Sequence, residues 1–84
     1  MTSILTDQVL EAIRREYETA TNRYACFNSA HEGLAVIQEE FEELKAEVFK
    51  KHELRDDLLM KKEAIQVAAM ALRFIMDVIE FRKI

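Results

Sequence analysis

The chain has 84 residues, of which 50% are hydrophobic and 33% are charged, with a formal net charge of −4 at pH 7. This length supports one small domain, residues 1–84, and a single glycine with no proline excludes a disordered or loop-rich chain. The acidic balance argues against binding to a nucleic-acid backbone, which needs clustered lysine and arginine, and no run of about 18 uncharged apolar residues predicts a membrane span.

The N-terminus and the cysteine content indicate the compartment. Residues 1–7 lack a basic region followed by an apolar block, so a secretory signal peptide is not expected. Cys26 is the only cysteine, which excludes an internal disulfide and makes a reducing cytoplasm the simplest location.

The first predicted helix covers about residues 5–25. One apolar face recurs there at spacings of three and four residues, which is the pattern of an amphipathic helix. Its members are Leu10, Ile13, Tyr17, Ala20 and Tyr24. Either Ser3 or Thr6 has the side-chain oxygen that is needed to cap the start of this helix.

The second helix is predicted to begin near Ser29 and to end around residues 50–52. Ser29 and Glu32 fit a capping box, in which each side chain satisfies a free backbone N–H group. Lysines and His52 near residue 50 suit the negative end of the helix dipole. The apolar stripe of this helix again has spacings of three and four, and consists of Leu34, Ile37, Phe41, Leu44 and Val48.

The third helix is predicted to run from near Asp56 to about Arg82, and it carries two apolar stripes. The first contains Ile65, Ala68, Leu72, Ile75 and Ile79, and the second contains Val67, Ala71, Phe74, Val78 and Phe81. A helix that is apolar on more than half of its circumference needs partners on two sides. The hairpin of its own chain supplies one side, so we predict a dimer with this helix near the interface.

A group of carboxylates on the second helix has no nearby cation. Glu39, Glu40 and Glu43 have no lysine or arginine three or four positions away, whereas Glu42 is followed by Lys45 at three residues. Like charges at these spacings destabilise a helix by about 0.2–0.5 kcal/mol per pair. Such a run is usually a solvated helix face, and the alternative is a site for a bound cation.

The short turn between the second and third helices predicts an antiparallel hairpin. Glu43 lies ten residues before Glu53 and Glu63 lies ten residues after it, so the two carboxylates should stand at the same level. Glu40 and Gln66 are related in the same way, each one helical turn further from Glu53. These four side chains are candidate ligands for Mg²⁺ or Mn²⁺, which prefer oxygen donors.

These residues resemble the MazG-like nucleotide pyrophosphohydrolases, an all-α superfamily whose pattern is E-E-x-x-E, a spacer, and then E-x-x-D. Glu39, Glu40 and Glu43 match the first half and Glu63 matches the start of the second. The flanking residues 31–37 and 63–71 are similar to a prophage-type branch of the family, and the resemblance covers about residues 24–80.

The resemblance implies a three-helix chain that dimerises into a bundle and hydrolyses the α–β bond of a nucleoside triphosphate to release pyrophosphate. It implies that Glu40, Glu43 and Glu63 are metal ligands, and that Glu39 is a ligand or orients the attacking water. Among the cationic side chains, Lys62 is either a solvent-exposed residue near a helix start or a residue that binds a phosphate. Arg73 either pairs with Asp77 on a water-facing edge or contacts a phosphate.

Two departures from the family pattern support a second hypothesis. Gln66 stands where the family's enzymes carry aspartate, and the chain ends at Ile84, whereas many relatives have a further C-terminal segment that covers the substrate. The alternative function is therefore a catalytically weak or inactive helical module for nucleotide binding or protein interaction. Aromatic residues of the first helix and the following loop are expected to pack, or else to stack on a base; they are Tyr17, Tyr24 and Phe27.

Overall fold

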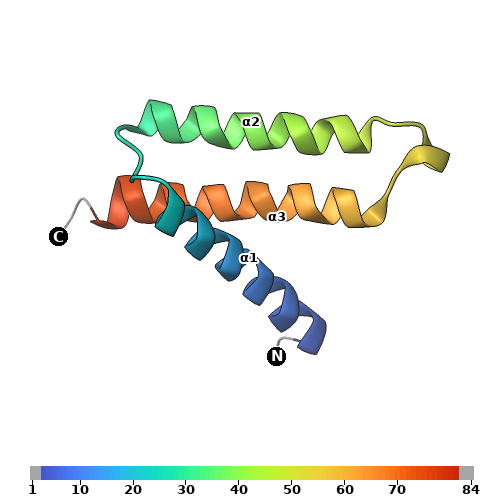
Figure 1. Ribbon diagram of the computed structural model, residues 1–84, viewed down its shortest axis with the longest axis horizontal. Coiled ribbons are helices and arrows are strands. Elements are labelled where there is room, and N and C mark those ends of the chain that lie inside the picture. The colour runs from blue at the N-terminus through green and yellow to red at the C-terminus, as the bar shows by residue number, and fades with distance from the viewer. Residues whose placement is uncertain (1–2, 82–84) are drawn as a thin grey trace.

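The computed structural model describes residues 3–81 and contains helices joined by short turns (Figure 1). The main helices are α1 (Ile4–Arg23), α2 (Ala30–Val48) and α3 (Asp57–Phe74). A 3₁₀ turn, η1 (His52–Leu54), precedes α3, which continues as a π-helix, η2 (Ile75–Glu80). No strand occurs in residues 3–81, which confirms the predicted all-α class. None of the helices in this part of the chain has the length and apolarity needed to cross a membrane.

Helices α1 and α2 begin at serine caps. The Ser3 hydroxyl accepts a hydrogen bond from the N–H of Thr6 at 3.0 Å, so Ser3 is the cap of α1. The Ser29 hydroxyl accepts from the N–H of Glu32 at 3.1 Å, as predicted. The Glu32 carboxylate in turn accepts from the N–H of Asn28, one residue before the cap, so both side chains satisfy free N–H groups.

Helix α3 begins at Asp56, whose carboxylate accepts hydrogen bonds from the N–H groups of Leu58 and Leu59 at 2.8 and 3.3 Å. A carboxylate at this position also stabilises the positive end of the helix dipole. The predicted end at Arg82 lies outside the described residues. Two other ends differ from the prediction, because α1 stops at Arg23 and α2 stops at Val48.

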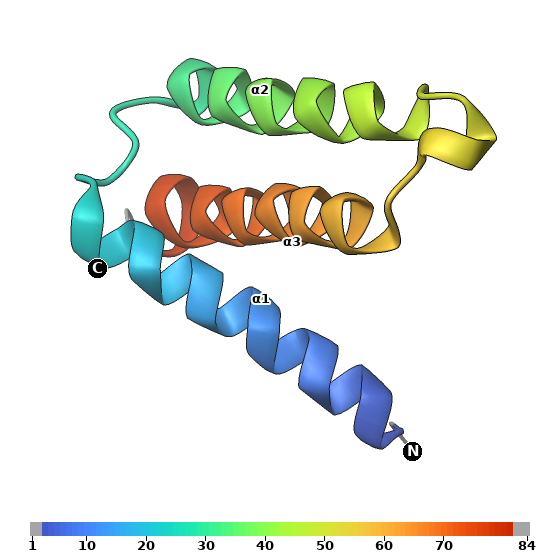
Figure 2. The same ribbon diagram turned by 45° about the vertical axis from the view of Figure 1, so that its right-hand side comes forward.

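Helices α2 and α3 run antiparallel and side by side, as both views show (Figures 1 and 2). Gly33 permits their close approach at the start of α2, because a Cβ atom there would lie 2.6 Å from Phe74 Cδ2 and 3.0 Å from Phe27 Cδ2. Helix α1 packs against α3 near the C-terminal end of the hairpin, and its N-terminal half diverges from the hairpin (Figure 2).

The core of residues 3–81 is small and lies where the three helices meet. Ala20, Ala69 and Met70 are buried together there, and no large side chain in this part of the chain is fully buried. Met70 therefore fills the core, as its flexible side chain suits it to do. The two apolar stripes of the third helix are covered only in part, because Ile75 and Phe81 remain 50% and 45% exposed.

Candidate metal centre and adjoining groove

Three carboxylates from two helices meet on the hairpin. Glu40 and Glu43 lie one turn apart on α2, and Glu63 lies opposite them on α3. One carboxylate oxygen from each residue lies within 4.8 Å of those of the other two. The antiparallel register therefore brings together three of the four side chains that the sequence places at one level.

The three carboxylates of the cluster lie close together where the protein partly shields them from water. Burial raises the pKa of Glu40 from its usual 4.5 to about 7, and hydrogen bonding with Glu43 and the charges of Glu43, Glu63 and Glu39 contribute to this rise. Burial also raises the pKa of Glu63, with Glu43 adding to the effect and the positive charge of Lys62 opposing it. Glu63 Oε2 is buried and has no hydrogen-bond partner. An unmatched buried carboxylate oxygen of this kind is suited to a bound cation.

The donor set fits Mg²⁺ or Mn²⁺. Both ions take oxygen ligands, and Mg²⁺ binds them at about 2.0–2.1 Å, so opposite ligands of one ion lie about 4.2 Å apart. The separations of up to 4.8 Å among Glu40, Glu43 and Glu63 exceed this distance, so the three side chains must move closer together to share one ion. Mg²⁺ usually keeps several waters or substrate phosphates as ligands, so three protein carboxylates are sufficient.

A groove of about 530 Å³ lies beside the cluster, between α1, α2 and α3. Glu40 belongs to both the cluster and the groove, and Glu39 lines the groove next to it. Tyr24 and Phe27, from the end of α1 and the following loop, line the other side. The volume lies in the range of about 300–1,000 Å³ that is usual for small-molecule sites, and an aromatic wall can stack on a planar ligand.

Gln66 lies in the wall of this groove and contacts the first helix. Its Nε2 donates a hydrogen bond of 2.6 Å to Oε1 of Glu16 on α1. Glu16 also lines the groove, and sequence reasoning overlooked it. A signal was present, because Glu16 lies three residues after Ile13 and four before Ala20, so it is a carboxylate on the apolar face of its helix.

Lys62 does not line the groove that Glu40 shares. It is exposed and borders a neighbouring hollow of about 390 Å³, which shares Glu16 and Gln66 with the groove. Its charge nevertheless acts on Glu63, where it opposes the rise in pKa that burial and Glu43 cause. Lys62 is therefore close to the acidic cluster but approaches it from outside the groove.

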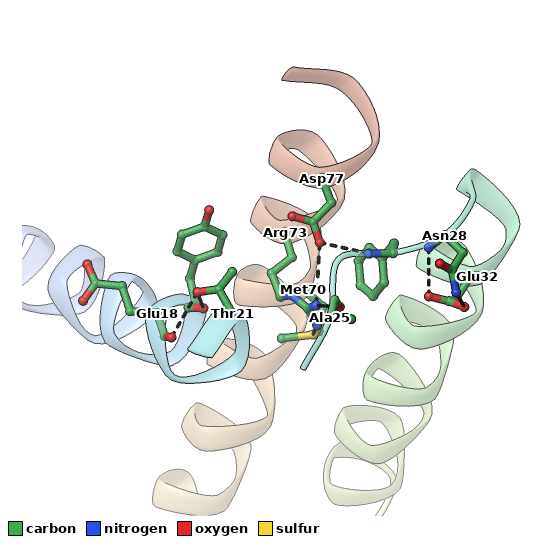
Figure 3. A network of polar contacts seen from close by, with 10 residues as sticks. Glu18, Thr21, Ala25, Asn28, Glu32, Met70, Arg73 and Asp77 are labelled. Atoms are coloured by element: carbon green, nitrogen blue, oxygen red, sulfur yellow. Dashed lines mark hydrogen bonds and ion pairs between the residues drawn. The ribbon is translucent and has the colours of Figure 1, made fainter. Parts of the chain in front are cut away.

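Arg73 and Asp77 form the i, i+4 ion pair that was one of the two alternatives for Arg73, but the pair is buried and does not lie on a water-facing edge. Counting backbone and side chain together, the two residues are 3% and 8% exposed. Arg73 Nη2 lies 3.6 Å from Asp77 Oδ2 (Figure 3). The loop after α1 covers the pair: Arg73 Nη2 donates to the carbonyl of Ala25 at 2.9 Å, and Asp77 Oδ2 accepts from the N–H of Phe27 at 3.2 Å. The guanidinium also stacks on the Phe27 ring at 4.4 Å. Arg73 thus borders the groove with its guanidinium already bonded within the protein.

Comparison of the chain with protein-family models, curated proteins and solved structures found no match. The resemblance to nucleotide pyrophosphohydrolases therefore rests on the motif residues themselves, and a proposal of function depends on the geometry of the cluster and the groove.

Proposed function

We propose that the protein is a metal-dependent nucleoside triphosphate pyrophosphohydrolase. The observation that carries this proposal is the convergence of Glu40, Glu43 and Glu63, from two helices, to within 4.8 Å of one another. The groove beside Glu40 adds space for a nucleotide. The spacing of Glu39, Glu40 and Glu43 before Glu63 supports the same class of reaction through the MazG-like pattern.

In this proposal Glu40, Glu43 and Glu63 hold Mg²⁺, with Mn²⁺ as the alternative. A cation held there would neutralise and polarise the phosphates. Glu39 lies in the groove beside Glu40, where its carboxylate accepts a proton from the water that attacks the α-phosphorus. The bond from that phosphorus to the bridging oxygen breaks, and pyrophosphate leaves. Tyr24, which is 60% exposed at the groove, stacks on the base.

A homodimer is part of the proposal, because the isolated chain leaves too much apolar surface exposed. Its accessible surface is 6513 Å², whereas a folded monomer of 9.9 kDa typically exposes about 5,200 Å². Leu5, Phe49 and Leu58 are each more than 70% exposed. We expect sedimentation velocity at micromolar concentration to give twice the chain mass. A single species at the mass of one chain would contradict the dimer.

A second candidate function is a nucleotide-binding or protein-interaction module with little or no turnover. The observation that favours it is the neutral side chain of Gln66, whose amide is engaged with Glu16. Three carboxylates bind a cation less tightly than four. The module would act in the same reducing cytoplasm that the lone Cys26 favours.

The test is release of pyrophosphate from a panel of nucleoside triphosphates in the presence of Mg²⁺ or Mn²⁺. We expect turnover that the Glu63→Gln variant loses by at least about 100-fold, because losing even the partner of a metal ligand costs about 10–100-fold. The matched control is Glu53→Gln, which removes the same charge from an exposed residue of η1.

The outcomes separate the two functions. Metal-dependent turnover that is lost in Glu63→Gln and kept in Glu53→Gln supports the enzyme. No turnover, with a melting temperature that still rises when metal is added, supports the binding module. No response to either metal removes the metal site from both candidates.

A further inference from the structure

Glu16 and Gln66 are 50 residues apart in the chain and form a short contact at the edge of the candidate metal site. We propose that Glu16 is a positioning residue: it holds the Gln66 side chain so that the carbonyl oxygen Oε1 serves as a neutral fourth ligand, and it supplies beside that ligand the negative charge that an amide lacks. This inference rests on the metal-binding role proposed for Glu40, Glu43 and Glu63.

The chemistry of the two groups determines which end of the amide faces which helix. An ionised carboxylate only accepts hydrogen bonds, whereas an amide has a donating NH₂ end and an accepting carbonyl end. Glu16 therefore takes the NH₂ end, as the 2.6 Å bond from Nε2 shows. This leaves the carbonyl oxygen Oε1 as the end that can act as a ligand, and Gln66 lines the groove together with Glu40 of the facing helix α2.

The charges explain why glutamine is suited to position 66 when glutamate occupies position 16. A glutamate at 66, which has the shape of glutamine, would place a second carboxylate close to Glu16, because Gln66 Nε2 lies 2.6 Å from Glu16 Oε1. Two like charges at such a distance repel strongly in a partly buried place. With glutamine at 66, the pair has a single negative charge, on Glu16, and one hydrogen bond joins it to Gln66. The charge therefore lies one hydrogen bond away from the proposed ligand Gln66. Mutation of a residue that hydrogen-bonds to a metal ligand commonly lowers metal affinity by about 10–100-fold.

The pair can be tested by moving the carboxylate from one helix to the other. The readout is the affinity for Mn²⁺ alone, measured by titration calorimetry or by the spectrum of free Mn²⁺, with no nucleotide present. Glu16→Ala removes charge and acceptor, and we expect it to weaken binding by about 10–100-fold. Glu16→Gln keeps an acceptor oxygen for the Gln66 amide and should lose less. The swap variant Glu16→Gln with Gln66→Glu exchanges carboxylate and amide between side chains of the same length, and should bind Mn²⁺ within a few-fold of the wild type.

The control is Glu18→Ala, which removes a glutamate two residues further along α1 whose side chain is 56% exposed. It should bind Mn²⁺ as the wild type does. Gln66→Glu alone should lower the melting temperature of the metal-free protein, because it sets two carboxylates against each other, and Glu16→Gln added to it should restore that temperature.

Three results would overturn the proposal. The first is wild-type Mn²⁺ affinity in both Glu16 variants. The second is a swap variant that folds but binds no better than Glu16→Ala. The third is a wild type that binds no Mn²⁺ at millimolar concentration, which removes the metal site together with its positioning residue. If the wild type binds Mn²⁺, Glu40→Gln does not, and the Glu16 variants are unchanged, then only the role of Glu16 falls. Should Glu16→Ala fail to fold, the swap variant and Glu16→Gln decide the question.

Discussion

Replacing Glu40 by glutamine is expected to make the metal-free protein more stable at pH 8 and, in the same variant, to remove its response to Mn²⁺. Burial and the neighbouring carboxylates raise the pKa of Glu40 to about 7. At pH 8 its charge is therefore desolvated and repelled in the folded state but solvated in the unfolded state. Because Glu40 is only partly buried, solvent screens much of this repulsion. We expect a gain of about 1 kcal/mol, or about 4–8 °C in melting temperature for a chain of this size.

The sign of the pH dependence follows from the same shift. The folded state holds the Glu40 proton more tightly than the unfolded state, whose pKa is near 4.5. The stability that this proton contributes is fully present below about pH 4.5 and is lost as the pH rises through about 7. The wild type without metal should therefore lose melting temperature between pH 5 and pH 8 more steeply than Glu40→Gln does. Scanning calorimetry at several pH values measures both slopes.

The effect of metal on stability provides the other half of this prediction. Saturating Mn²⁺ should raise the melting temperature of the wild type at pH 8, because a ligand that binds only the folded state stabilises it. Glu40→Gln should show little or no rise. Glu42→Gln is the matched control, since Glu42 is exposed on the same helix and lies outside the cluster. Equal Mn²⁺ responses in the two variants would show that the cluster does not bind the ion.

The helix starts and the level of the acidic residues were predictable because both depend on local or countable features. Ser29 and Asp56 were recognisable as helix starts from their residue types and from the residues just after them in the chain, and the hydrogen bonds are those of ordinary caps. The register of Glu43 and Glu63 could be obtained by counting residues from a short turn, since antiparallel helices rise equally on both sides of it. The helix ends were less predictable, because residues 24–25 and 49–51 carry no proline or glycine that would stop a helix.

The contacts that cross from the loop and from α1 were not predictable from periodicity. Arg73 of α3 and Asp77 of η2 fall on one polar stripe, and a helical pattern alone places such a stripe in water. The loop through Ala25 and Phe27 covers them, and the path of that loop depends on contacts nearly 50 residues away in the chain. The bond from Gln66 to Glu16 likewise joins residues 50 positions apart in the chain, which is why no residue of α1 was expected beside the metal ligands.

Removing the Asp77 carboxylate is expected to be the most destabilising single substitution in the described part of the chain. The side chains of Arg73 and Asp77 are 4% and 0% exposed, so Asp77→Ala leaves a buried guanidinium with no counter-charge. It also removes the acceptor for the N–H of Phe27. Breaking a buried pair in this way typically costs about 3–5 kcal/mol. Urea unfolding at a fixed protein concentration, followed by circular dichroism, measures the loss.

If an unpaired buried charge causes the loss, removing the charges of both Arg73 and Asp77 should lower the free energy of unfolding far less than removing the charge of Asp77 alone. Arg73 Nε and Asp77 Oδ1 are buried without hydrogen-bond partners, so part of the desolvation of the pair is not compensated even in the wild type. The double variant Arg73→Leu with Asp77→Leu should therefore recover most of the stability that Asp77→Ala loses. A double variant as unstable as the single one would show instead that the bonds to the loop, rather than the charge balance, hold this end of the protein together.

An exposed ion pair provides the control, because it has the same geometry without the burial. Arg14 Nη1 and Glu18 Oε1 are also 3.6 Å apart at an i, i+4 spacing, but their side chains are 69% and 56% exposed. Water screens such a pair, and Glu18→Ala should change the free energy of unfolding by no more than about 0.5 kcal/mol. The difference between this variant and Asp77→Ala isolates the effect of burial, since distance and spacing are shared. Equal losses at the two sites would contradict the interpretation that burial makes the charge of Asp77 necessary.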